Sequence, residues 1–448
     1  MKRVALHTLG CKLNFSETSS IGKQFMRNGF EVVDFNEEAD VYVINTCTVT
    51  ENAERDCRQV VRRALRRNPG AYVMVTGCYA QLRPDEIAGI EGVDVVLGSK
   101  EKFDVFAFMD GFEKRELACI FVSPTEDLSG EFGFASSGEG DGRTRAYFKV
   151  QDGCDYKCTF CTIPLARGAS RSMDPGKAVE RFAELLEQGY REIILTGVNV
   201  GDYGKAASGK SAAGGVDMSF YRLLLRLLDV RGDYRLRISS IEPNLLTDDI
   251  LELTAGEERM AKHFHIPLQS GSPAILRLMQ RRYNTAFYES LIYRANKMIP
   301  GLGIGVDVIT GFPGEGEKEF METHNFLLGL PVSYFHVFTY SERPRTKAIN
   351  MPGMVDVGER RRRTNMLRIM GQKKRDDFYA GMVGRTVDVL FEGGNHSQGG
   401  EAGVMRGFSS EYVRVSHPYD GGLVNRFTRF RILSSDGEHC HGEILGND

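Results

Sequence analysis

Hydrophobic and polar positions in the first quarter of the chain follow two periods. Short apolar, β-branched runs at 4–8, 41–45 and 72–76 predict buried strands, and amphipathic stretches at 16–28 and 53–67 predict helices between them. Strands that alternate with helices are typical of an α/β fold with mostly parallel strands. We therefore expect an open α/β sheet in an N-terminal domain over about residues 1–115.

The same alternation continues more regularly after residue 145. Strands are predicted at 146–151, 192–196, 235–239, 263–268, 303–310 and 334–339, and helices at 175–188, 220–228, 273–280, 285–299 and 315–328. Six βα units are too few for a closed eight-stranded barrel, so we expect a partial (β/α)6 barrel over about 140–372. The segments 127–145 and 206–216, rich in small residues, are interpreted as a linker and a flexible surface loop.

The last part of the chain changes pattern again. A strongly basic helical stretch at 360–375 is followed by short strands at 386–391, 403–407, 412–416, 423–432 and 441–445. Short strands separated by turns predict a small all-β, OB-like barrel over about 377–446, a fold that often binds oligonucleotides.

The overall charge excludes a protein that coats nucleic acid by bulk attraction, because 57 basic residues stand against 60 acidic ones. Contact with RNA would have to come from local patches. For the arginines of the helix at 51–67, a merely solvated face remains an alternative to a phosphate contact. The candidate arginines are Arg55, Arg58, Arg62 and Arg66 on that helix, and Arg406, Arg414, Arg426, Arg429 and Arg431 on the barrel.

The chain shows no signal-peptide core and no apolar stretch long enough to span a membrane. Nine cysteines, an odd number, fit a reducing compartment better than a secreted disulfide scaffold. We expect a cytoplasmic protein with no membrane partner.

Three cysteines, Cys154, Cys158 and Cys161, lie in one loop after the first strand of the predicted barrel. Thiolates with this spacing can bind three corners of a cubane iron–sulfur cluster and leave the fourth iron open to chelate a small molecule. A zinc site or a disulfide is the alternative, but zinc usually needs a fourth Cys or His nearby, and none follows Cys161.

A second set of cysteines is spread along the sequence. Cys11, Cys47 and Cys78 each follow one of the first three strands. Because the carboxyl ends of parallel strands meet at one edge of a sheet, we expect the three thiols to be neighbours and to hold a second cluster. A free buried cysteine is common, and Cys57, inside a helix, is interpreted as such a structural residue.

Polar and small residues follow the strands of the predicted barrel and are candidates for cofactor contacts. His263 and His265 alternate along one strand and are interpreted as packed or hydrogen-bonded side chains rather than metal ligands. The candidate cofactor-binding residues are Thr196, Gly197, Asn199, Ser240, Glu242 and Gln269.

The Cys-x3-Cys-x2-Cys spacing, with Phe160 before the last cysteine, resembles the signature of radical S-adenosylmethionine (SAM) enzymes. With all six cysteines in order, nearly the whole chain resembles the radical SAM methylthiotransferases. This resemblance implies an N-terminal cluster domain, a radical SAM domain and a C-terminal TRAM barrel. It also implies two [4Fe-4S] clusters, SAM, with Phe160 among its contacts, and a reducing electron donor of the flavodoxin or ferredoxin type.

Within that family, the segments 10–14, 196–204 and 239–243 most resemble the branch that acts on N6-threonylcarbamoyladenosine at position 37, in the anticodon loop of tRNA. The resemblance implies methylthiolation of adenine C2 with two SAM molecules and a sulfur donor. One SAM would methylate a sulfur at the N-terminal cluster, and the other would yield a 5′-deoxyadenosyl radical that removes the C2 hydrogen. Catalytic residues beyond the two clusters are unknown from sequence.

Several alternatives remain open. Other branches of the family act on isopentenyladenosine 37 of tRNA or on an aspartate of a ribosomal protein. Outside the enzyme class, the same cysteines would suit an iron–sulfur protein that binds RNA or senses redox state.

Overall fold

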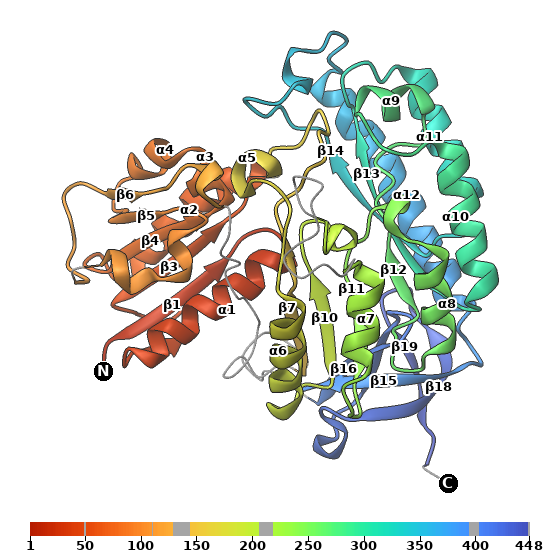
Figure 1. The fold of residues 1–448 in the computed structure, drawn as a ribbon. Helices are drawn as coiled ribbons and strands as arrows, with labels where there is room; N and C mark the ends of the chain where they lie inside the picture. The colour runs from red at the N-terminus through yellow and green to blue at the C-terminus, as the bar shows by residue number, and fades with distance from the viewer. Residues whose placement is uncertain (49–50, 110, 129–143, 206–217, 394–402, 447–448) are drawn as a thin grey trace.

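The first part of the chain forms a six-stranded, fully parallel sheet in the computed structural model, which describes residues 1–48, 51–109, 111–128, 144–205, 218–393 and 403–446 (Figure 1). The three predicted strands are confirmed, and three further strands of three residues each were too short to give a pattern. The strand order is β2 (Glu31–Val33), β1 (Arg3–Thr8), β3 (Val41–Thr46), β4 (Tyr72–Gly77), β5 (Val95–Leu97) and β6 (Cys119–Phe121).

The sheet extends past residue 115, where we expected the N-terminal domain to end. Strand β6 pairs in parallel with β5, Val95 facing Cys119, so the sheet continues to Phe121. This strand was not predicted, because its three residues lie in a single apolar run, 117–122, too short to show a period.

Two helices cover opposite faces of this sheet. Helix α1 (Lys12–Arg27) buries Phe25 against one face, and α2 (Glu51–Arg67) buries Cys57 against the other. Successive strand residues point to opposite faces, which is why Val43 joins the first core and Ile44 the second. The chain therefore leaves β1 and β3 toward different sides, and a crevice opens between their carboxyl ends. Cys57 is buried in a helix, as predicted.

The central part is the expected partial barrel. Its six strands run parallel in chain order, in two three-stranded sheets joined through bridges such as Ser240 with His265. The first and last strands do not pair, so one side of the barrel is open. The strands are β7 (Arg145–Lys149), β10 (Glu192–Thr196), β11 (Arg235–Ile238), β12 (His263–His265), β13 (Gly303–Thr310) and β14 (Tyr334–Thr339).

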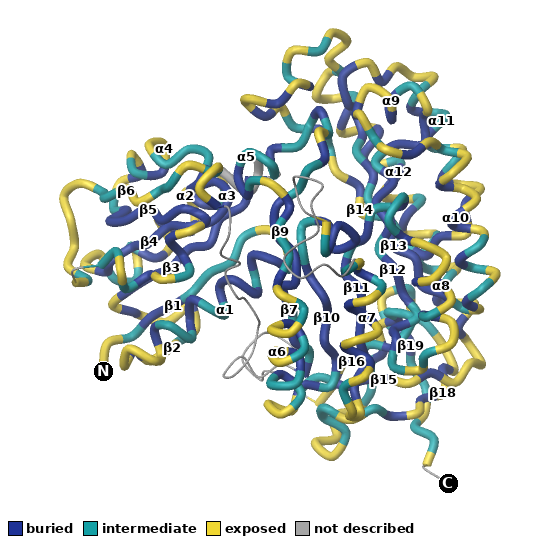
Figure 2. Tube along the Cα trace, in the orientation of Figure 1, coloured by how far each residue is buried: buried dark blue, intermediate teal, exposed yellow. Residues whose placement is uncertain are grey.

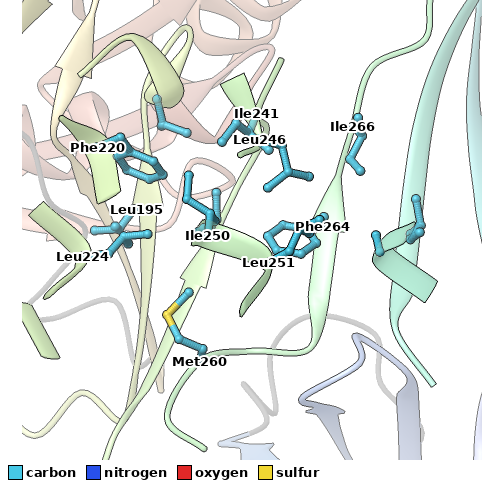
Figure 3. Packing of buried hydrophobic residues seen from close by; sticks show 14 of the residues in the cluster. Leu195, Phe220, Leu224, Ile241, Leu246, Ile250, Leu251, Met260, Phe264 and Ile266 are labelled. Atoms are coloured by element: carbon cyan, nitrogen blue, oxygen red, sulfur yellow. The ribbon is translucent and has the colours of Figure 1, made fainter. Parts of the chain in front are cut away.

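Helices surround the outside of this barrel, and its first five strands are mostly buried (Figure 2). The last strand, β14, has one buried residue, Val337. Figure 3 shows Phe220 and Leu224 near Leu195, and Leu251 near Phe264. Helix α8 was not predicted. The helices are α6 (Pro175–Glu187), α7 (Phe220–Leu228), α8 (Asp248–Gly256), α9 (Pro273–Leu278), α10 (Thr285–Met298) and α11 (Glu317–Gly329).

The chain ends in the predicted small β-barrel, which is closed. The long helix α12 (Val357–Ala380) packs along β14 and leads into it. Two predicted strands began too early, because Tyr412 lies in a turn with φ +69° and residues 421–423 form a short helix. The strand order is β15 (Thr386–Glu392), β16 (Val404–Ser409), β17 (Arg414–Pro418), β19 (Cys440–Ile444) and β18 (Phe427–Ser435).

The C-terminal barrel docks against the amino ends of the central strands, below them in Figure 1. Arg237 donates hydrogen bonds to the carbonyls of Ser409 and Ser410, both at 3.0 Å, and Arg235 donates to the carbonyl of Asp388 at 2.8 Å. Both guanidinium groups also contact the fully buried Glu192 at 3.0–3.1 Å. A turn of the C-terminal barrel is thereby fixed into the lower end of the partial barrel.

Most of the predicted linker at 127–145, and all of the predicted loop at 206–216, lie outside the described residues. Within the described part of the chain, no helix has the length and apolarity needed to cross a membrane.

Replacing Glu192 with Gln is expected to destabilise the protein by about 3–5 kcal/mol at neutral pH, because it leaves two arginines buried without a carboxylate. Burial raises the pKa of Glu192, but Arg237 and Arg235 outweigh it and lower the pKa from 4.5 to about 2. The stabilisation is therefore complete above pH 4.5 and is lost as the pH falls toward 2.

Unfolding by urea at several pH values tests this prediction, and the difference between wild type and variant should shrink below pH 4.5. Glu392→Gln is the control, since Glu392 pairs with Arg145 but is 32% exposed and should cost about 1 kcal/mol or less. Equal effects of the two substitutions would contradict the role given to Glu192.

Candidate active site: two cysteine trios and a cavity

The first three cysteines meet at the carboxyl edge of the N-terminal sheet. Cys11 is the residue before α1, Cys47 follows β3, and Cys78 begins the short helix α3 (Cys78–Leu82) directly after β4. Because β1, β3 and β4 are neighbours in the sheet, residues far apart in sequence come together. All three cysteines line the same cavity.

Two glycines allow this close approach. Gly10 has φ +98°, and a Cβ there would stand 2.8 Å from the sulfur of Cys47. Gly77 has φ +101°, and a Cβ would stand 2.3 Å from the carbonyl oxygen of Thr46. Side chains at either position would force the cysteine-bearing segments apart.

The second trio lies in the loop between β8 (Gln151–Asp152) and α5 (Ile163–Arg167). The loop closes on itself through a hydrogen bond from the Cys154 amide to the carbonyl of Gly168, at 3.0 Å. Gly153, at φ +71°, leaves no room for a Cβ, which would meet the carbonyl of Ala169. Backbone amides also point at the sulfurs of Cys154 and Cys161, each at 3.4 Å.

Each trio receives one buried arginine. Arg281 donates to the sulfur of Cys158 at 3.1 Å and is held by Glu242, and Arg167 donates to the sulfur of Cys78 at 3.3 Å. Hydrogen bonds from charged donors favour the thiolate and are among the contacts that tune iron–sulfur clusters.

Arg167 belongs to a buried network of charges that joins the N-terminal sheet to the central barrel. Glu17, on α1, accepts from Arg167 at 2.9 Å, Lys102 at 2.7 Å and Lys149 at 3.2 Å. Asp152, just before the second trio, accepts from Lys149 at 3.0 Å and from Arg167 at 3.1 Å. Burial raises the pKa of Glu17, but Arg167, Lys102 and Lys149 together hold that pKa well below its ordinary value.

The thiols fit ligation of iron. Burial raises the pKa of Cys154 and Cys161 to about 12 and also raises the pKa of Cys11. Such thiols stay protonated until a metal takes the place of the proton. No three Cys, His, Asp or Glu side chains of the described residues stand close enough to share one ion. In a cubane each iron takes one thiolate, so three cysteines can bind three of its corners.

One cavity of about 900 Å³ lies at the open side of the partial barrel. It is bordered by the first trio, by strand ends of the barrel, by α12 and by the turn of the C-terminal barrel. Pockets that hold small molecules are typically about 300–1,000 Å³. Its polar and charged lining residues include Lys12, Arg167, Thr196, Ser239, Ser240, His265, Asp307, His336, Arg368, Arg375, Tyr412 and Arg414.

The candidate cofactor residues divide into two groups. Thr196, Gly197 and Ser240 lie at the carboxyl ends of barrel strands and line the cavity. The other four lie outside its lining, and their contact with SAM stays a prediction. Asn199 donates to Asp202 at 2.8 Å, Glu242 holds Arg281, Gln269 has φ +68° and pairs with β13, and Phe160 packs near Phe312.

The two histidines of β12 are hydrogen-bonded, as predicted. Nε2 of His263 lies 2.9 Å from the hydroxyl of Tyr334, and Nε2 of His265 lies 2.9 Å from a carboxylate oxygen of Asp307.

Among the basic patches, the structure separates exposed from buried arginines. The four arginines predicted on α2 are exposed, and so are the five on the C-terminal barrel, so the choice between solvated face and RNA contact stays open. In α12, however, Arg360 and Arg363 are buried and bound to Glu342 and Glu315, so they serve the fold.

Sequence reasoning missed Glu17, Lys149, Arg167 and Arg281. The signal available was a charged residue at a position that should be apolar: Lys149 interrupts a buried strand, and Glu17 lies on the inner face of a helix. Such positions need a partner that only the folded chain identifies.

Comparison with known proteins decides the family. The description "Uncharacterized protein family UPF0004" matches residues 3–98, and "Radical SAM superfamily" matches residues 148–327. The chain is 36% identical to the threonylcarbamoyladenosine tRNA methylthiotransferase MtaB of Bacillus subtilis (strain 168), over 99% of this chain and 97% of that protein. The chain belongs to the radical SAM methylthiotransferase family.

Members of the family that are named for another substrate are also similar to this chain. A tRNA-2-methylthio-N(6)-dimethylallyladenosine synthase of Fusobacterium nucleatum is 32% identical over 99% of this chain and the full length of that protein. Among solved structures, the radical SAM methyltransferase TsrM of Kitasatospora setae matches with a TM-score of 0.52 at 15% identity, covering 78% of this chain and 77% of that one. That likeness concerns the fold alone.

Gly10→Ala is expected to destabilise the methylthiotransferase more than Gly29→Ala. Both glycines have positive φ, so each substitution costs about 1–2 kcal/mol of backbone strain. Only at Gly10 would the new methyl group meet Cys47, since nothing lies within 4 Å of a Cβ at Gly29. Thermal unfolding and iron content after anaerobic reconstitution measure the difference. Equal midpoints and equal iron would refute the steric role of Gly10.

Proposed function

We propose that this enzyme methylthiolates C2 of N6-threonylcarbamoyladenosine at position 37 of tRNA, converting t6A to ms2t6A. The observation that carries the proposal is similarity over 99% of the chain to an enzyme named for that nucleoside, together with six cysteines arranged as two trios. The anticodon loop of tRNA is then the macromolecular partner, and SAM and a sulfur donor are the other reactants.

We further propose that Cys154, Cys158 and Cys161 bind one [4Fe-4S] cluster and that Cys11, Cys47 and Cys78 bind a second. When bound, the clusters supply the electron that cleaves SAM and a place for the sulfur that is transferred. The electron itself would come from a flavodoxin-type or ferredoxin-type donor.

The protein's own residues then bind and orient the reactants and enclose them in the cavity. A central domain over about 140–372 provides the barrel strand ends, where Thr196 and Ser240 offer hydroxyls to the cavity. Arg281 and Arg167 hold one sulfur of each trio in place. Adenine C2–H carries no acidic proton, so the cavity needs no general base; it needs to hold the ring and exclude water.

The target base must leave the stack of the anticodon loop to enter the cavity, and unstacking is least costly in a single-stranded loop. The C-terminal barrel, over about 377–446, presents exposed arginines for the rest of the RNA, among them Arg406, Arg426 and Arg429. Contacts of this kind act on phosphates and make binding dependent on salt.

Deleting the gene tests the substrate. We expect ms2t6A to disappear from the nucleosides of total tRNA, with t6A accumulating, as measured by liquid chromatography and mass spectrometry. Restoring the wild-type gene should restore ms2t6A. If ms2t6A persists while the methylthio derivative of isopentenyladenosine, also called N6-dimethylallyladenosine, disappears, the enzyme belongs to the other tRNA branch.

Two triple variants test the clusters. The wild-type enzyme, reconstituted anaerobically, should hold about eight irons, and replacing either trio with Ala should leave about four. The variant lacking Cys11, Cys47 and Cys78 should still form 5′-deoxyadenosine from SAM but no methylthio product. The variant lacking Cys154, Cys158 and Cys161 should form neither. About four irons in the wild type would rule out a second cluster.

A further inference from the structure

The wall of the cavity has an unusual charge balance. Lys12, Arg368, Arg375 and Arg414 line it, against one acidic residue, Asp307, among the described lining residues. The carboxylate of Asp307 is already engaged with His265 at 2.9 Å. The cavity therefore presents a positive lining to whatever enters it.

These four cations differ from other basic residues near the site. Arg167 and Arg281 are bound to carboxylates, whereas no salt bridge joins Lys12, Arg368, Arg375 or Arg414 to an acidic side chain of the described residues. The buried Nε of Arg375 also lacks a hydrogen-bond partner there. Cations facing a cavity without carboxylate partners suit an anionic ligand.

Two of the cations lie near one point of the barrel interior. The ammonium of Lys12 is 5.6 Å from the ring centre of Tyr412, and Arg414 follows Tyr412 by two residues. Across from them, His336 stacks edge-on against His265, with ring centres 5.5 Å apart. Burial lowers the pKa of His336, and the charges of Lys12 and Arg414 lower it further, so its imidazole is neutral and can donate one hydrogen bond.

The structure of the nucleoside determines where its N6 substituent lies relative to C2. C2 and the N6 substituent are on the same Watson–Crick edge of adenine. A base whose C2 faces the first cysteine trio therefore directs its N6 substituent to residues close to that trio. Lys12 follows Cys11 directly, and both line the cavity. The threonylcarbamoyl group ends in a carboxylate, whereas a dimethylallyl group is apolar.

We propose that Lys12 and Arg414, with His336 beside them, form a carboxylate subsite that binds the threonyl end of the substrate and sets specificity against apolar N6 substituents. This inference rests on the proposed function. Arg368 and Arg375, on the helix bordering the same cavity, remain available for phosphates of the loop.

Three anticodon stem-loops of one sequence test the subsite: one with t6A37, one with the methyl ester of t6A37, and one with N6-dimethylallyladenosine 37. All share the same phosphates, and only the first has the carboxylate. Reconstituted wild-type enzyme should bind the first loop about 10–100-fold more tightly than the ester, as expected for a hydrogen-bonded ion pair. Fluorescence anisotropy gives Kd, and single-turnover assays give the rate of methylthiolation.

Arg414→Gln and Lys12→Gln should weaken binding of the t6A loop by about 10–100-fold while leaving the ester and dimethylallyl loops unchanged. Arg429→Gln is the matched control, an exposed arginine of the same barrel outside the cavity lining. Its proposed contacts are with phosphates, so any loss of affinity should be equal for the three loops. Iron content and 5′-deoxyadenosine formation are measured for each variant, because Lys12 adjoins Cys11.

The outcomes separate two failures. If the wild type methylthiolates the t6A loop yet binds the t6A and ester loops with equal Kd, the carboxylate subsite is refuted, while the substrate assignment stands. The same conclusion follows if Arg414→Gln raises Kd equally for all three loops. If the wild type acts only on the dimethylallyl loop, the proposed function is wrong and the subsite falls with it.

Discussion

The structure depends on a set of charges that water does not reach. Glu17 accepts from Lys102, Lys149 and Arg167, and Asp152 accepts from Lys149 and Arg167. Glu17 comes from α1, Lys102 from the short helix after β5, Lys149 from the first strand of the barrel, and Asp152 and Arg167 from either side of the second cysteine loop. Removing one member of such a network costs about 3–5 kcal/mol, because a charge remains buried without its partner. Arg167 also donates to the sulfur of Cys78. One guanidinium group therefore contacts both this charge network and the first cysteine trio.

The incomplete barrel explains why a second sheet is needed at all. Because β7 and β14 do not pair, the interior of the barrel is open between them. Helix α1 packs beside β7, with Phe15 against Tyr147 at 5.9 Å, and α12 packs along β14. The N-terminal sheet thereby brings the cysteines at its carboxyl edge to the same opening. A closed eight-stranded barrel would have had no opening at which a second sheet could bring its cysteines to the barrel interior.

The features predictable from sequence are those set by short-range patterns. The long strands, the barrel order and the meeting of Cys11, Cys47 and Cys78 follow from periodicity and from the rule that parallel strands end at one edge. Three short strands of the N-terminal sheet, β2, β5 and β6, were missed because two faces cannot be distinguished over three residues. Arg167 and Arg281 were missed for a different reason. Their sequence neighbours do not reveal that Cys78 and Cys158 lie within hydrogen-bond distance, since 89 and 123 residues separate the pairs.

The turn at Tyr412 gives the C-terminal barrel a second role. Tyr412 borders the cavity and stacks on His263, with ring centres 4.6 Å apart, while Arg237 fixes the neighbouring carbonyls. The C-terminal barrel, which is expected to bind RNA, therefore also closes one side of the cavity. A chain truncated before β15 would keep all six cysteines, but solvent would enter its cavity from the side that the C-terminal barrel covers. Any radical formed in the cavity would then react with solvent before it reached the substrate.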